Sequence, residues 1–114
     1  MICEIVTFPA VAGMSRDDLV EDARHVVTRW RGEAELVRKH FVVSDDGSTL
    51  KGIYFWTSRA AAQNAHDEAW LQQAEKRIGV RPTIDYFDTF MIIDNEKDAV
   101  TEYPAEKVDA EAGA

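Results

Sequence analysis

The sequence has few of the residues that cross-link a chain or anchor it in a membrane. Its 114 residues include one cysteine, Cys3, so no internal disulfide can form and a reducing compartment is expected. No apolar run approaches the roughly 20 residues of a membrane span, and no signal-peptide pattern is present. We therefore expect a cytoplasmic protein with no membrane partner.

Basic residues are also scarce. The chain has 13 Lys and Arg against 21 Asp and Glu, a formal charge of −8, and half of this excess falls in residues 96–114. Binding to nucleic acid needs clustered bases, so no nucleic-acid partner is expected. The length fits one domain. We predict a domain over residues 1–95 and an acidic C-terminal tail over 96–114, mobile or packed on a partner subunit.

Motifs for the commonest cofactors are missing as well. The sequence has no glycine loop for phosphates, no dinucleotide fingerprint and no paired Cys or His at metal-ligand spacing. We therefore expect neither a metal nor a cofactor.

What the sequence does contain is a regular alternation of strand and helix patterns in the order β-α-β-β-α-β. The strands are predicted at 2–8, 34–44, 49–57 and 83–94, and the helices at 15–31 and 58–78. This order predicts an α+β, ferredoxin-like fold, in which a four-stranded antiparallel sheet carries both helices on one face.

Large apolar side chains occur on both faces of the predicted sheet. Tyr54 and Trp56 point to one face, whereas Ile53 and Phe55 point to the other. Two helices can cover only one face, so a second copy of the sheet is the simplest cover for the other. We expect a homodimer that forms a dimeric α+β barrel; the alternative is a monomer whose own tail shields the second face.

His66 is the candidate catalytic residue. It lies four residues from both Ala62 and Trp70, so these side chains share the helix face that meets the sheet. A histidine between helix and sheet can act as a general base near neutral pH. The alternative is a core histidine that donates to a backbone carbonyl.

Aromatic residues near this position are candidates for a small-molecule site, and the alternative for them is ordinary core. Gly52 inside a strand marks a bulge or a close approach of backbone or ligand. Tyr86 and Asp88 share a strand face and could pair at the mouth of a pocket. The predicted substrate-binding residues are Tyr54, Trp56, Trp70 and Tyr86.

One stretch of the chain resembles a known family. The matching residues are Gly52–Ala62 (GIYFWTSRAAA), His66, Trp70, Gly79-Val80 and Asp85–Asp88 (DYFD). They are similar to the YdhR-like monooxygenases of the dimeric α+β-barrel superfamily, and the likeness covers roughly residues 1–95. The resemblance implies a ferredoxin-like subunit, a homodimer, and a pocket between each sheet and its helices.

The resemblance also implies an activity. Related members are oxidoreductases that oxygenate electron-rich aromatic compounds without metal or flavin, which would make His66 the base, with Tyr54 and Trp56 as wall and hydrogen-bond donors. Members that degrade haem use an Asn on the first strand, and this chain has only Thr7 there. Two alternatives remain: a cyclase or dehydratase that uses His66 and Tyr54, and a non-enzymatic dimer that binds a small apolar or aromatic molecule.

Overall fold

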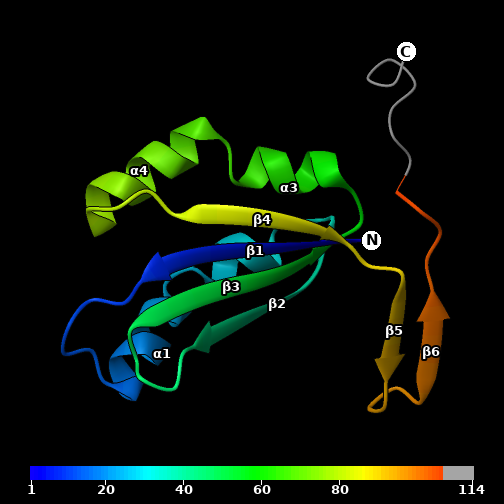
Figure 1. Ribbon diagram of the computed structural model, residues 1–114, viewed down its shortest axis with the longest axis horizontal. Helices are drawn as coiled ribbons and strands as arrows, with labels where there is room; N and C mark the ends of the chain where they lie inside the picture. Colours follow the sequence, from blue (N-terminus) through cyan, green and yellow to red (C-terminus); the bar gives the residue numbers. More distant parts are fainter. Residues whose placement is uncertain (107–114) are drawn as a thin grey trace.

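The structure is a computed structural model that describes residues 1–106. Four helices lie against a four-stranded antiparallel sheet, and two further strands form a separate sheet (Figure 1). The elements are β1 (Ile2–Pro9), α1 (Arg16–Arg24), α2 (Val27–Arg31), β2 (Leu36–Val43), β3 (Thr49–Trp56), α3 (Arg59–Ala65), α4 (Glu68–Ile78), β4 (Thr83–Asp88), β5 (Met91–Asp94) and β6 (Ala99–Glu102). The predicted α+β, ferredoxin-like fold is confirmed.

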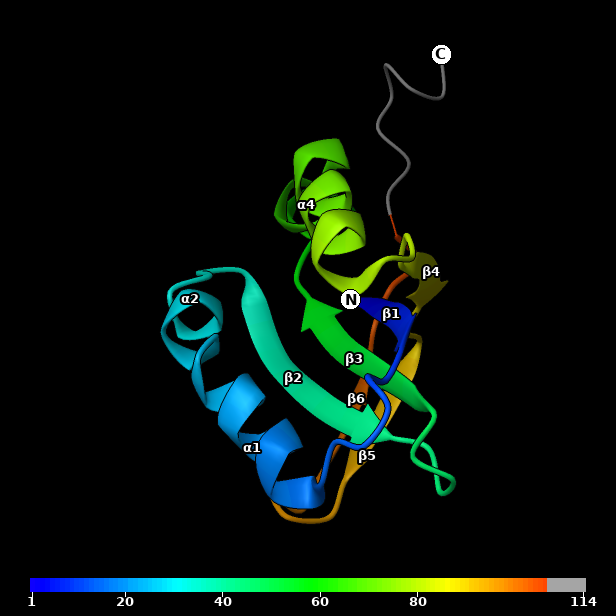
Figure 2. The ribbon, with the colours of Figure 1, turned by 90° about the vertical axis from the view of Figure 1, so that its left-hand side faces the viewer.

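Strand β1 lies inside the main sheet, whose order is β2-β3-β1-β4. It pairs antiparallel with β3 on one side and with β4 on the other, while β2 pairs with β3. The helices lie on one side of this sheet (Figure 2). On that side, α1 and α2 lie near β2, whereas α4 lies near the other edge of the sheet. The helix-covered side of β1 and β3 therefore forms the centre of the core.

The first predicted helix, 15–31, is in fact two helices. α1 ends at Arg24 and α2 begins at Val27. The run 26–28 consists of β-branched residues, which are poor helix formers, and the chain bends there. After the bend Trp30 reaches the core with 7% of its surface exposed, whereas α1 buries no residue.

The second predicted helix, 58–78, also breaks. α3 ends at Ala65, and Asp67 adopts an extended backbone whose carboxylate accepts a hydrogen bond from the Trp70 N–H at 2.8 Å. An aspartate in this role starts a new helix, because it satisfies a backbone N–H that would otherwise lack a partner. His66 thus lies at the junction of two helices, not on the face of one.

The last predicted strand, 83–94, is likewise divided. β4 pairs with β1, and β5 turns away to pair with β6. The Thr89 N–H donates to the Met1 carbonyl at 2.9 Å, so the main sheet ends at the start of β1. β6 falls within the predicted acidic tail, and residues 107–114 of that tail lie outside the described residues. The predicted domain limits stay a prediction.

The core is built from β1, β3 and the helix surfaces that face them. Large side chains from the sheet meet small side chains from α3, which brings this helix close to the strands. The buried apolar residues of this cluster are Ile2, Val6, Trp30, Tyr54, Trp56, Ala62 and Ala65.

The opposite face of the sheet also carries apolar side chains, as the sequence predicts. Ile5, Ile53 and Phe55 are half-buried there, and Phe87 is 54% exposed. The four helices all lie on the other side (Figure 2). A partner subunit over this face stays a prediction.

Candidate functional site

The centre of the candidate site is a carboxylate in the core. Glu4 alternates with Ile2 and Val6 along β1, so its side chain points toward the helices, and none of its surface is exposed. The Trp56 indole N–H donates to Glu4 Oε1 at 3.0 Å. A buried carboxylate is costly unless it is paired, which makes Glu4 an exception to the apolar pattern of its strand.

His66 supplies the second polar group of this centre. Its Nδ1 lies 2.8 Å from Glu4 Oε1, and both side chains are completely buried. The two atoms are at ion-pair distance without hydrogen-bond alignment, and within residues 1–106 neither ring nitrogen of His66 nor Glu4 Oε2 has a hydrogen-bond partner. Unsatisfied buried polar atoms cost about 1–3 kcal/mol each. Unsatisfied polar atoms in a core call for an explanation, and a catalytic role is one of those explanations.

Aromatic rings surround the pair. The His66 ring centroid is 4.7 Å from that of Tyr54, 4.5 Å from that of Trp70 and 5.2 Å from that of Trp30. The contacts with Tyr54 and Trp70 are edge-on and that with Trp30 is tilted, and such contacts hold a ring in place. They also keep the local dielectric constant low, which strengthens the interaction between the carboxylate and the imidazole.

Tyr54 stays protonated in this setting. Burial raises the pKa of its hydroxyl well above the usual value, the negative charge of Glu4 raises it further, and the positive charge of Arg29 acts in the opposite direction. The phenol is therefore available as a hydrogen-bond donor and not as a base. Its ring lies over Gly52, where an added Cβ would come within 2.8 Å of it. The sequence predicted a bulge or a close approach of backbone or ligand at Gly52, and the group that approaches is instead the Tyr54 side chain.

Tyr86 lies near Glu4, at the side of the site that faces Arg59. Burial, together with the nearby charge of Glu4, raises the pKa of Tyr86 to about 12, and the Arg59 guanidinium lies 5.1 Å from its ring centroid. Asp88, predicted to pair with Tyr86, instead accepts from the backbone N–H of Glu106 at 3.0 Å.

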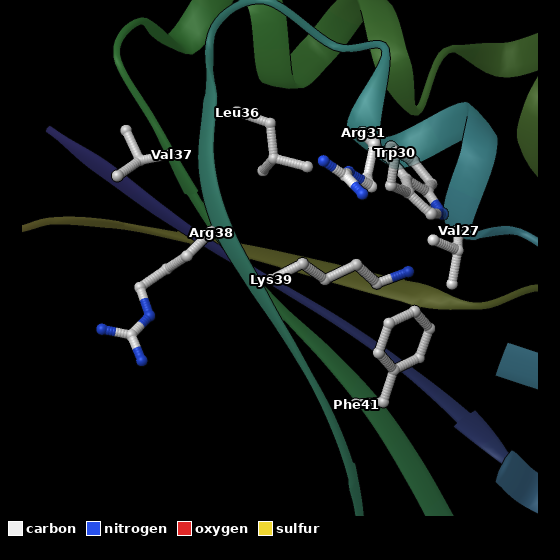
Figure 3. Close-up of a pocket in the computed structure, with 8 residues that line it drawn as sticks. All are labelled: Val27, Trp30, Arg31, Leu36, Val37, Arg38, Lys39 and Phe41. Atoms are coloured by element: carbon white, nitrogen blue, oxygen red, sulfur yellow. The ribbon is translucent and has the colours of Figure 1, made fainter. Parts of the chain in front are cut away.

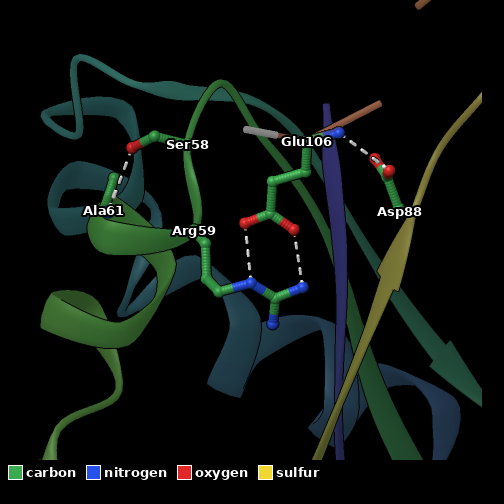
Figure 4. Close-up of polar contacts among 5 residues, drawn as sticks. All are labelled: Ser58, Arg59, Ala61, Asp88 and Glu106. Carbon is green, nitrogen blue, oxygen red and sulfur yellow. Dashed lines mark hydrogen bonds and ion pairs between the residues drawn. The ribbon is translucent and has the colours of Figure 1, made fainter. Parts of the chain in front are cut away.

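The C-terminal segment closes this edge of the site (Figure 4). Both carboxylate oxygens of Glu106 accept hydrogen bonds from Arg59, at 2.7 and 2.8 Å. This bidentate pair ties the end of the described chain to the first turn of α3. It keeps Arg59 over Tyr86.

A cavity of about 910 Å³ lies beside the pair, beneath α1 and α2 and the end of α4. Of the predicted site residues, Tyr54 and Trp70 line it, whereas His66, Trp56 and Tyr86 do not. His66 contacts the two lining rings, so it lies one layer behind the cavity wall. A smaller cavity of about 250 Å³ opens between β2 and α2 (Figure 3).

Within 1–106 no three or more His, Cys, Asp or Glu side chains are grouped so as to hold a metal ion. None of the helices in this range is long and apolar enough to cross a membrane.

Sequence reasoning missed Glu4, Arg29 and Lys39. The signal for Glu4 was present, because it occupies a core-facing position between Ile2 and Val6 in an otherwise apolar strand. Lys39 was hidden by an irregularity in β2 between Leu36 and Arg38, which shifts the register and turns Lys39 to the helix side opposite Tyr54.

Comparisons with known proteins support the fold. No protein-family model matches the chain, and no curated protein matches it in sequence. Among solved structures, it is similar to a monooxygenase from the gene ActVA-Orf6 of Streptomyces coelicolor, solved with the ligand nanaomycin D. That match has 23% identity and a TM-score of 0.57, over 75% of this chain and 84% of that one.

Two further solved structures match over slightly more of the chain. Rv0793 from Mycobacterium tuberculosis has 16% identity and a TM-score of 0.58, over 82% of this chain and 97% of its own. A protein described as an antibiotic biosynthesis monooxygenase has 17% identity and a TM-score of 0.56, over 78% and 98%. At these identities the likeness establishes the fold that this chain shares with them.

Proposed function

We propose that this protein is a cofactor-independent monooxygenase of the YdhR-like type, which acts on a small electron-rich aromatic compound. The observation that carries the proposal is the fully buried pair of Glu4 and His66, in which the second ring nitrogen of His66 has no partner within residues 1–106. The Streptomyces coelicolor protein and one other structurally similar protein reported above are described as monooxygenases, and the former was solved with the ligand nanaomycin D.

In the proposed reaction, Nε2 of His66 accepts a proton from a phenol or an activated C–H of the substrate. The Glu4 carboxylate, 2.8 Å from Nδ1, stabilises the imidazolium that results. The substrate anion gives an electron to O₂, and the two radicals combine. For an anthrone, the CH₂ group becomes a carbonyl: one oxygen atom enters the product and the other leaves as water.

Access to His66 requires movement in the cavity wall. Trp70, at the first turn of α4, is half-buried and lines the cavity, and its ring contacts that of His66. We propose that Trp70 turns aside when the substrate enters. The Tyr54 hydroxyl, which remains protonated, then donates to the substrate oxygen as negative charge develops there.

The proposal includes a homodimer in a cytoplasmic setting. The open sheet face, with Phe55 at its centre and Phe87 54% exposed, is the surface on which a second copy would pack. Analytical ultracentrifugation at micromolar concentration is expected to give the dimer mass, and Phe87→Arg to shift it to monomer. Val80→Arg, at a residue that is 51% exposed after α4, is the control. A monomer mass for the unchanged protein contradicts the dimer.

Oxygen uptake with a panel of anthrones and hydroquinones tests the activity. His66→Gln and Glu4→Gln are expected to lower the rate at least 100-fold, because general-base catalysis contributes about 10²–10⁴. Glu75→Gln is the matched control for Glu4→Gln, since Glu75 is exposed on α4 and does not line the cavity. Equal uptake by the unchanged protein and both site variants, with the fold intact by circular dichroism, contradicts the proposal.

One observation favours a second candidate, a non-enzymatic binding protein for a small aromatic molecule. His66 does not line the cavity, and a binding protein needs no base in contact with its ligand. This candidate predicts ligand retention with no turnover. A cyclase or dehydratase that uses the same residues is distinguished by product formation under anaerobic conditions.

A further inference from the structure

The cavity of about 910 Å³ has a charge opposite to that of the protein. Acidic residues outnumber basic ones in the whole chain, 21 to 13. Around the cavity the ratio is reversed, because one acid, Asp22, accompanies five bases. The basic lining residues are Arg16, Arg29, Lys39, Lys51 and Arg77.

Lys39 is the most enclosed of these bases. Its Nζ lies 3.9 Å from the ring centroid of Phe41 and 4.5 Å from those of Trp30 and Tyr54. Figure 3 shows its side chain extended between Trp30 and Phe41. Within residues 1–106 it has no carboxylate at ion-pair distance, so aromatic faces are its closest partners there.

Arg29 brings a second cation to the same place. Its guanidinium lies 4.1 Å from the Trp30 ring centroid and donates to the Ala65 carbonyl at 2.9 Å. That bond fixes the guanidinium against the end of α3 and leaves its other N–H groups available. Two cations thus share one aromatic wall, and neither has an acidic partner within residues 1–106.

We infer that this cavity binds an aromatic acid, whose anionic group lies against Lys39 and Arg29 and whose ring lies against apolar side chains of the lining, such as Leu19, Phe41 and Leu50. An anion would neutralise two cations that otherwise repel each other in a partly buried site. The ring of the acid would bury its surface on the apolar part of the lining. The inference rests on the proposed function in that it names the class of its substrate, while binding itself can be tested separately.

The same geometry couples binding to a proton. Burial, and then the charge of Arg29, lowers the pKa of Lys39 to about 7, with Glu4 partly offsetting them. A bound anion favours the ammonium form, so binding above pH 7 takes up a proton. The groups that face Lys39 are Arg29 on α2, Glu4 on β1 and Tyr54 on β3. The other titratable or charged groups around the cavity are Arg16, Asp22, His25, Lys51 and Arg77.

Calorimetric titration of the full chain with 2-naphthoate and its neutral isostere 2-naphthamide tests the inference. At pH 6.5 the acid is expected to bind at least tenfold more tightly than the amide. Its affinity is expected to fall by pH 8.5, with proton uptake measured in two buffers of different ionisation enthalpy. Equal affinity of acid and amide, or no binding of either at millimolar concentration, overturns the inference.

Variants assign the effect to Lys39. Lys39→Met is expected to weaken naphthoate binding at least tenfold and to abolish the proton uptake. Lys39→Arg, which stays charged, is expected to keep the preference for the acid and lose the pH dependence. Lys76→Met, on the exposed side of α4, is the control, and His25→Gln tests whether the other titratable lining residue supplies the proton uptake. Unchanged binding in Lys39→Met, or proton uptake lost only in His25→Gln, overturns the assignment. Naphthoate undergoes no oxygenation in this assay, so this result and that of the oxygen-uptake assay are independent.

Discussion

The two helix pairs cover the same sheet in different ways. In α3 and α4, Ala62, Ala65 and Ala74 are almost fully buried, whereas α1 buries no residue and α2 buries only Trp30. Small side chains let a helix approach the strands closely, and the pair that lacks them leaves a cavity beneath it. The close pair holds His66 against Glu4. The distant pair provides the room that a ligand needs.

The variant with the largest expected effect tests how closely α3 packs against the sheet. Ala62→Leu inserts three carbons at a fully buried position and is expected to lower the free energy of unfolding by about 3 kcal/mol. Ala23→Leu, on the wall of the cavity, is the matched variant and is expected to change it by less than about 0.5 kcal/mol. Urea denaturation followed by tryptophan fluorescence measures both. Similar losses in the two variants would remove the difference between the helix pairs.

The next effect tests the charge on the cavity side. The pKa of Lys39 falls from its usual 10.5 to about 7, so the unfolded chain binds more protons than the folded one between these values. Stability from this residue therefore rises with pH across that window and is lowest below pH 7. Lys39→Met is expected to raise the free energy of unfolding by about 1–3 kcal/mol at pH 6, and by less at pH 9. A gain of the same size at both pH values would show that the lysine is not titrating.

A third variant tests the packing of the Tyr54 ring, which contacts Trp30 of α2 and His66 at the end of α3. Gly52→Ala places a Cβ within 2.8 Å of the Tyr54 ring, which is itself held by Trp30 and His66. We expect a loss of about 1–2 kcal/mol from this crowding. In a Tyr54→Leu background the same change is expected to cost little, because the ring is gone. Additive losses would mean that the ring is not the cause.

The smallest effect concerns the C-terminal tie to the close pair. Arg59 and Glu106 are partly exposed, at 36% and 25%, so their ion pair is expected to contribute only about 0.5 kcal/mol. A double-mutant cycle with Arg59→Gln and Glu106→Gln measures this coupling, which should decrease in 1 M salt. Coupling above about 2 kcal/mol would show that the segment is an integral part of the domain.

The sequence was sufficient to predict the fold, but not the breaks that divide both predicted helices and the last predicted strand. Strand patterns predict the four-stranded sheet, since these signals are local. The break at Asp67 was missed because helix-forming alanines before it and helix formers after it suggest continuity. Asp67 starts a new helix because its carboxylate bonds to a backbone N–H in place of continuing the first helix, and the spacing of apolar residues does not reveal this alternative.

The site was predicted in part for a similar reason. Tyr54, Trp56, Trp70 and His66 do come together around one centre, although two of them lie behind the cavity wall. Glu4 was overlooked because strand periodicity was used only to place apolar groups. A charged residue at a core-facing position is the pattern that identifies such a pair.

The position of β1 has a consequence for how the chain is made. Glu4 belongs to a strand that is synthesised before both of its partners, because its indole donor lies 52 residues further along and β4 comes later still. During synthesis the strand is apolar, unpaired and able to pair wrongly. The carboxylate that remains ionised in water then opposes premature burial of that strand. We therefore expect the residue at the centre of the finished site also to disfavour wrong pairing of its strand in the nascent chain.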